Sequence, residues 1–326
     1  MSSKNGSLEV TIRYKGLDQT ISGTPDDVTK AYFEVISKLI PNFDVISGLI
    51  EKPNLINIAN NLKGIVSLYK DRVIVLRDDI ETQDAILLAL SGKYLSYRIN
   101  LANKDTMGVS DIIDATGKTR KNVMFVLHKL ANTNSIEKVT ESEFRISESK
   151  MLQYMSKRIS SLRIRRMTDF TKKYNTIIAN HDYDAIGFTI GYEGRRIDEL
   201  VNILKENGIQ TLVDVRRDAY SKYNDSFNEG VLSEKLTESK IRYLHLPELG
   251  VNYVDRQKLK ELHNYSDYFK NYSDYIDKNS DLISLMRDLS RYNTLCLMCF
   301  ERDYRRCHRS VLADKLKDKG LMFVHI

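Results

Sequence analysis

The regular alternation of apolar, strand-like runs with helical segments over residues 185–326 is the feature that most constrains the fold. Parallel strands need long crossover connections, which are most often helices. The alternation is therefore typical of a mostly parallel sheet that helices cover on both faces, which is an α/β fold. The expected strands are Ile186–Ile190, Thr211–Val215, Ile241–Leu246, Thr294–Met298 and Met322–Ile326.

Polar side chains gather directly after four of these strands. In open parallel sheets a ligand binds beyond the carboxyl ends of the strands. The four polar groups should therefore meet at one rim of the sheet and form a site there. They are residues 191–195, residues 214–224, residues 247–250 and residues 299–309.

The last of these loops has the most distinctive sequence, T-L-C-L-M-C-F-E-R-D-Y-R-R-C-H-R at 294–309. Cys299 ends the apolar run, and three arginines precede a helix that opens near Cys307 and His308. Arginines and a helix N-terminus stabilise a thiolate, so Cys299 is a candidate nucleophile, and an anion would suit the same place. Cys299 could equally be a buried packing residue. Cys307 could be a resolving thiol, a helix cap or a packing residue.

Zinc is an alternative for this loop, because Cys296, Cys299, Cys307 and His308 are four candidate ligands. Residues three apart on a strand point to opposite faces, which separates Cys296 from Cys299. Cys307 and His308 are adjacent, and on a helix their side chains would diverge. We therefore predict no metal. Neither a dinucleotide-binding glycine motif nor a P-loop is present, and we predict no cofactor.

The other rim residues allow two readings each. Asp214 and Arg216 could form a structural ion pair, or a general base beside an anion clamp. Glu248 could accept a loop N–H or act as an acid-base group. His308 could transfer protons or cap its own helix. We take Cys299, Asp214, Glu248 and His308 as candidate catalytic residues.

Arginines and aromatic residues at the rim suit the binding of an anion, a base or a sugar, although loop packing would explain the aromatic residues as well. The candidate residues for binding substrate or an anion are Arg216, Arg309, Tyr192, Tyr223, Asn224 and Cys307.

Six separated motifs of this region resemble, in order, those of the family called domain of unknown function 488. They read T-I-G-Y-E-G-R, L-V-D-V-R-R, S-K-Y-N, F-N, I-R-Y-L-H-L-P-E-L-G and C-F-E-R-D-Y-R-R-C-H-R. The resemblance covers about residues 185–326 and implies a Rossmann-like α/β domain with a site but no established reaction. The motifs point to Asp214, Arg216, Tyr223, Asn224, Glu248, Cys299, Cys307, His308 and Arg309.

Residues 1–80 are expected to form a small α+β domain. Residues 8–14 alternate between apolar and polar side chains, as one face of a strand would. Thr24 followed by Pro25 and two acids is a strong helix start, and the helix should run to about Leu39.

Residues 81–147 have the pattern helix, helix, turn, helix, hairpin. This order resembles winged helix-turn-helix domains, whose third helix enters the major groove of DNA. The third helix, expected over 119–131, has one apolar face and one polar face. Its candidate nucleic-acid-binding residues are Lys118, Arg120, Lys121 and Asn122.

Residues 148–184 are expected to form a basic linker helix. Arg163, Arg165 and Arg166 are candidates for phosphate contacts. A solvated linker helix without a partner explains the same pattern.

Composition narrows the class of protein. The 326 residues are 42% hydrophobic, and the net charge of +6 permits a nucleic-acid or phosphate partner without requiring one. Three cysteines, all within 296–307, do not form a secreted disulfide framework. We find no secretory signal and no run of about 20 apolar residues, so we predict a cytoplasmic protein without a membrane segment.

These observations favour a nucleic-acid-associated enzyme that acts on a base, nucleotide or phosphate through the Cys, Asp, Arg and His residues of the rim. DNA or RNA is then the expected partner. The alternative is a DNA-binding regulator whose α/β domain senses a small anionic ligand without catalysis. By analogy with other winged-helix proteins, the chain could form a homodimer.

Overall fold

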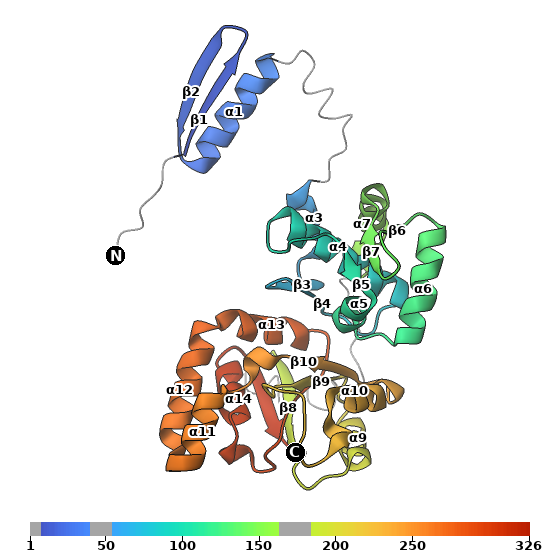
Figure 1. Cartoon of the computed structure of the whole chain (residues 1–326), viewed down its shortest axis with the longest axis vertical. Helices are drawn as coiled ribbons and strands as arrows, with labels where there is room; N and C mark the ends of the chain where they lie inside the picture. The colour runs from blue at the N-terminus through green and yellow to red at the C-terminus, as the bar shows by residue number, and fades with distance from the viewer. Residues whose placement is uncertain (1–7, 40–53, 163–183) are drawn as a thin grey trace. The chain divides into compact units, whose positions relative to one another are not determined.

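A computed structural model of the chain describes residues 8–39, 54–162 and 184–326 (Figure 1). The chain divides into two compact units, Met1–Asn54 and Leu55–Ile326. None of the helices in the described ranges is both long enough and apolar enough to cross a membrane.

The first unit is a β-hairpin covered by one helix. β1 (Leu8–Tyr14) pairs antiparallel with β2 (Leu17–Gly23), and α1 (Pro25–Leu39) follows. Thr24 begins the helix as predicted, because its Oγ1 accepts the backbone N–H of Asp27 at 3.3 Å. The small core of this unit contains Ile12, Ile21 and Val28.

The first half of the second unit is built around one buried helix, α4. The elements are α3 (Leu55–Leu62), β3 (Val66–Tyr69), β4 (Arg72–Val75), α4 (Thr82–Arg98), β5 (Met107–Gly108), α5 (Val109–Thr116), α6 (Arg120–Asn132), β6 (Ile136–Lys138), β7 (Glu143–Ile146) and α7 (Glu148–Leu162). Most of α4 is buried, and α3, α5, α6 and β7 pack around it.

The helices and the hairpin expected over 85–146 are all present. β5 adds to the hairpin, so the small antiparallel sheet has the order β5-β7-β6. Gly117 ends α5 with a left-handed backbone (φ 65°), which glycine adopts without strain. Thr119 begins α6 by accepting the backbone N–H of Asn122.

The second half of this unit is the predicted α/β fold, and all five strands of its sheet are parallel. The elements are β8 (Ala185–Gly191), α9 (Ile197–Glu206), β9 (Thr211–Asp214), η1 (Asp225–Phe227), α10 (Glu229–Glu238), β10 (Arg242–His245), η2 (Pro247–Leu249), α11 (Tyr253–Leu262), α12 (Tyr265–Lys278), α13 (Ser280–Ser290), β11 (Leu295–Cys299), η3 (Tyr304–Arg306), α14 (Arg309–Lys317) and β12 (Leu321–His325). The strand order is β10-β9-β11-β8-β12. The chain thus returns from the edge strand β10 to insert β11 between β9 and β8.

Side chains of β11 alternate between the two faces of the sheet. One face packs against α12, α13 and α14, and the other packs against α9 and α10 (Figure 1). Cys299 lies in the first core and Cys296 lies in the second. The prediction that these two cysteines face opposite sides is therefore confirmed.

Two glycines let the rim loops approach each other closely. A Cβ atom on Gly191 would lie 2.0 Å from the carbonyl oxygen of Glu301. A Cβ atom on Gly250 would lie 2.2 Å from the backbone nitrogen of Arg217. Any side chain at either position would push apart the loops that follow β8, β9, β10 and β11.

A buried arginine joins the two halves of the second unit. Arg242, at the start of β10, donates to the carbonyl oxygens of Val75 (2.6 Å) and Ala115 (3.0 Å). Burial lowers the pKa of Arg242 to about 10, although the charges of Asp78 and Asp114 oppose this shift. Its donors satisfy carbonyl groups that would otherwise be buried without partners.

We expect the substitution Gly191→Ala to lower the free energy of unfolding by about 1–3 kcal/mol, because the added methyl group collides with backbone that has no room to move. Gly230→Ala is the matched control, since a Cβ there has no neighbour within 4 Å and Gly230 lies within α10. That change should be neutral or stabilising by up to about 1 kcal/mol. Denaturant unfolding of both variants measures this. Equal free energies of unfolding for the two variants would contradict the close approach of Gly191 to the backbone of Glu301.

Candidate active site

Cys299, Cys307 and His308 come together at the carboxyl edge of the sheet. Cys299 ends β11, and η3 leads back to Cys307 and His308 just before α14. Cys307 has an extended backbone (φ −123°, ψ 140°), whereas His308 is already helical (φ −57°, ψ −20°). This change of backbone conformation directs two adjacent side chains to the same point. The divergence expected for neighbours on a helix therefore does not occur.

The Nδ1 atom of His308 faces both sulfur atoms. It lies 3.9 Å from Cys299 Sγ and 3.8 Å from Cys307 Sγ. The three atoms all lie within 4.8 Å of one another, and all three residues are buried. Among the described residues, they form the one group of three or more candidate ligands that could hold a metal ion.

The other ring nitrogen of His308 determines which way the ring points. Nε2 lies 3.0 Å from the carbonyl oxygen of Val215, which can only accept, so Nε2 carries the proton. Tyr272 of α12 packs edge-on against the ring at 5.0 Å, and its hydroxyl donates to Leu249 O at 2.6 Å. Nδ1 is thereby held toward the two sulfur atoms.

This arrangement separates the proton affinities of the two thiols. A hydrogen bond from the Cys307 thiol and the charge of His308 hold the pKa of Cys299 well below its usual value, against the effect of burial. Burial keeps the pKa of Cys307 well above its usual value. Burial alone would lower the pKa of His308, but the Cys299 thiolate and Glu301 raise it. In the absence of a metal, these shifts favour negative charge on Cys299 and positive charge on His308.

Glu301 and Arg256 complete this cluster. Oε2 of Glu301 lies 3.2 Å from Cys299 Sγ, and Oε1 lies 3.6 Å from Nη2 of Arg256 on α11. Burial raises the pKa of Glu301, and the charge of Cys299 adds to this effect. The hydrogen bond between the Cys299 thiol and Glu301 Oε2 also lowers the pKa of Cys299.

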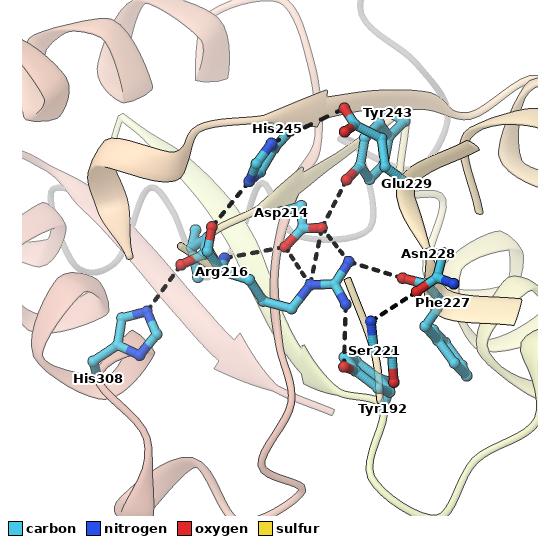
Figure 2. Close-up of polar contacts among 11 residues, drawn as sticks. Tyr192, Asp214, Arg216, Ser221, Phe227, Asn228, Glu229, Tyr243, His245 and His308 are labelled. Carbon is cyan, nitrogen blue, oxygen red and sulfur yellow. Dashed lines mark hydrogen bonds and ion pairs between the residues drawn. The ribbon is translucent and has the colours of Figure 1, made fainter. Parts of the chain in front are cut away.

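Asp214 and Arg216 form a buried, bidentate ion pair with a shortest distance of 2.6 Å (Figure 2). Asp214 also accepts the hydroxyl of Tyr243 at 2.7 Å. Arg216 donates further to the hydroxyl of Tyr192 (3.1 Å) and to the carbonyl oxygen of Phe227 (2.9 Å). Burial lowers the pKa of Arg216, but its bonds to Asp214 raise it more, so the guanidinium stays charged.

The loop between β9 and α10 is ordered around this ion pair. Tyr192 stacks on Phe227 with the ring centres 4.3 Å apart. The backbone N–H of Ser221 donates to Asn228 (Figure 2). Asn224 begins η1 by accepting the N–H of Ser226. Tyr223 is 86% exposed on this ordered loop, 6.0 Å from the ring of Phe300.

Arg309 binds backbone rather than facing solvent. It is buried, and its guanidinium donates to the carbonyl oxygens of Glu301 and Arg302. Its contacts thus hold the turn that follows Cys299.

Glu248 lies at the same rim but has cationic partners from another part of the unit. Its carboxylate lies 3.3 Å from Lys70 and 3.7 Å from Arg72. Among the described residues, no hydrogen bond joins Glu248 to the cysteine cluster.

The predicted nucleic-acid contacts divide into three groups. Arg120, Lys121 and Asn122 are exposed on α6. Lys118 is half-buried and donates to the carbonyl oxygens of Asp78 (2.6 Å) and Ile80 (2.7 Å), so its ammonium group is already engaged. Arg163, Arg165 and Arg166 lie outside the described residues.

Sequence reasoning gave no role to several residues that form the site. They are Glu301, Arg256, Tyr243, Phe227 and Tyr272. Glu301 could have been found, because it is two residues from Cys299. Arg256 and Tyr272 come from helices whose sequences read as ordinary polar segments, and no local pattern marks them.

Comparison with known families gives a match within the C-terminal part of the chain. Residues 196–316 match the family described as Domain of unknown function DUF488. The matched range includes Asp214, Arg216, Cys299, Cys307 and His308, and the family description names no reaction. Comparisons with curated proteins and with solved structures found no match.

We expect the thiolate absorbance of chelator-treated protein to persist well below the free-thiol pKa of about 8.5, because Cys307 and His308 stabilise the charged form of Cys299. A pH titration in the ultraviolet measures this. The substitution Cys299→Ser should remove the change in thiolate absorbance that occurs below the free-thiol pKa. Cys296→Ser should retain it, because burial raises the pKa of the Cys296 thiol.

The lowered pKa of Cys299 also makes the free energy of unfolding depend on pH. Since folding depresses the pKa of Cys299, its contribution to stability is present above the unfolded pKa and is lost as the pH falls through the folded value. A thiolate that appears only above the free-thiol pKa would contradict the assignment.

Proposed function

We propose that the protein is a nucleic-acid-associated enzyme that acts on a base, nucleotide or phosphate at the rim of the C-terminal sheet. The observation that supports this most directly is the convergence of Cys299, His308 and Glu301. The sulfur of Cys299 lies 3.9 Å from Nδ1 of His308 and 3.2 Å from Oε2 of Glu301, so a thiolate, an imidazole and a carboxyl group would provide nucleophilic and acid-base chemistry in one place.

The surroundings of this cluster suit a nucleic-acid substrate. Tyr223 exposes most of its ring beside Phe300, which follows Cys299 directly, and a base can stack on such a ring. Arg302, Arg305 and Arg306 are exposed on the turn between Cys299 and Cys307. Exposed arginines attract phosphates and bind them through paired N–H groups.

Residues 82–146 support a role for DNA binding in particular. The order α4, β5, α5, α6, β6, β7 and the small sheet β5-β7-β6 resemble the arrangement of winged helix-turn-helix domains, which supports this part of the proposal. In such domains the helix equivalent to α6 lies in the major groove. Arg120, Lys121 and Asn122 are exposed on α6 and would contact DNA from there. Lys118 would help little, since its ammonium group already binds two carbonyl groups.

Two further expectations belong to this proposal. We place the protein in the cytoplasm, because its three cysteines are free and buried. We also propose that the winged helix binds as a homodimer, which follows from analogy with other winged-helix proteins alone.

The experiment incubates the full chain with single-stranded and duplex DNA and RNA oligonucleotides, and measures binding against salt concentration and product mass. We expect binding that weakens steeply with salt, and a mass change that Cys299→Ser abolishes while Arg120→Ala reduces only the binding. Cys296→Ser is the control and should behave as the wild type. Oligonucleotides that neither bind nor change would contradict the proposal.

The second candidate is a DNA-binding regulator whose α/β domain senses a small anionic ligand. Two observations favour it. The sulfur atoms of the cluster are completely buried, which hinders direct attack on a substrate. A cleft of about 820 Å³ lies beside the start of α6, lined among others by Arg72, Arg120 and His245. A ligand in this cleft would touch both α6 and β10. Binding of unchanged oligonucleotide in the experiment above would favour this candidate.

A further inference from the structure

The distances within the cysteine cluster are those of a metal site. Zinc lies about 2.3 Å from thiolate sulfur and about 2.0–2.1 Å from imidazole nitrogen, so tetrahedral geometry separates sulfur and nitrogen by roughly 3.6 Å. The observed separations from His308 Nδ1 are 3.9 Å to Cys299 and 3.8 Å to Cys307. The two sulfur atoms lie within 4.8 Å of each other, so small side-chain movements would bring all three ligand atoms onto one ion.

The second ring nitrogen of His308 is arranged as in other metal sites. A histidine ligand almost always donates its remaining N–H to a carboxylate, a backbone carbonyl or water, which fixes the tautomer that coordinates. Here Nε2 donates to Val215 O at 3.0 Å. The lone pair of Nδ1 is therefore directed at the sulfur atoms without any rearrangement of the ring.

A fourth ligand is also near. Oε2 of Glu301 lies 3.2 Å from Cys299 Sγ, and Arg256 holds the other carboxylate oxygen. Carboxylate oxygen is an ordinary zinc ligand at about 2.0–2.2 Å. Cys296 is excluded, because it lies in the core on the opposite face of the sheet.

We propose that Cys299, Cys307 and His308 bind one zinc ion, with Glu301 nearest to the fourth position. Two thiolates and one imidazole favour zinc over magnesium or calcium, which prefer oxygen ligands. Because the three ligands are buried, the ion closes the loop between β11 and α14 in the manner of a structural site. It thereby fixes the turn that exposes Arg302, Arg305 and Arg306.

This inference rests on the ligand geometry and does not require the proposed function. It does change how the proposed centre would act. With an ion bound, both thiolates are ligands and His308 no longer exchanges a proton at Nδ1. The proposed reaction would then need a nucleophile other than Cys299.

The experiment measures the metal content of the purified full chain, and then titrates chelator-treated protein with zinc against a chromophoric chelator. We expect close to one ion per chain. Cys307→Ser and His308→Gln should raise the Kd by more than the roughly 100-fold that loss of an outer-shell partner causes. Cys296→Ser is the matched control and should bind as the wild type does.

Cobalt provides a readout that needs no variant to fold. Wild-type protein loaded with cobalt(II) should show thiolate-to-cobalt charge-transfer absorbance with the visible bands of a tetrahedral site. Equal zinc affinity in the wild type and Cys307→Ser, or a cobalt spectrum without charge transfer, would overturn the proposal. Oligonucleotide conversion is measured separately, so either proposal can fail alone.

Discussion

The hydrogen bond from His308 Nε2 to the carbonyl oxygen of Val215 determines what the rim of this sheet can do. Because Nε2 is occupied as a donor, Nδ1 must face Cys299 and Cys307. A neutral ring turned the other way would present an N–H to the two sulfur atoms and would have no lone pair there for a metal ion. The acidity of Cys299, the proposed chemistry and the proposed zinc site all depend on this orientation.

The fold secures that hydrogen bond through neighbouring strands. β9 and β11 are adjacent and parallel, so Val215, which follows β9, lies beside the end of β11. Gly191 lets the turn after Cys299 pack against β8, and Arg309 holds the same turn through two backbone carbonyl groups. The Asp214–Arg216 pair orders the neighbouring loop from within. Many of the polar residues at the rim thus bind other parts of the rim loops and hold these loops in place.

Much of this could be predicted from the sequence, since strand and helix periodicities are local. The parallel sheet, the start of α1 at Pro25 and the opposite faces of Cys296 and Cys299 follow from such patterns. The convergence of the Cys307 and His308 side chains could not be predicted, because it depends on the extended backbone of Cys307 directly before the helical backbone of His308. The engagement of Arg309 and Lys118 by backbone carbonyl groups could not either, because spacing does not reveal which partner a cation finds in the folded chain.

The nitrogen chemical shifts of the His308 ring, assigned with the His308→Gln variant, test the central claim most directly. The structure predicts that Nε2 carries a proton throughout the pH range in which the protein is folded. Nδ1 should gain or lose its proton together with Cys299, or coordinate an ion. A neutral ring with its proton on Nδ1 and none on Nε2 would contradict this description of the site.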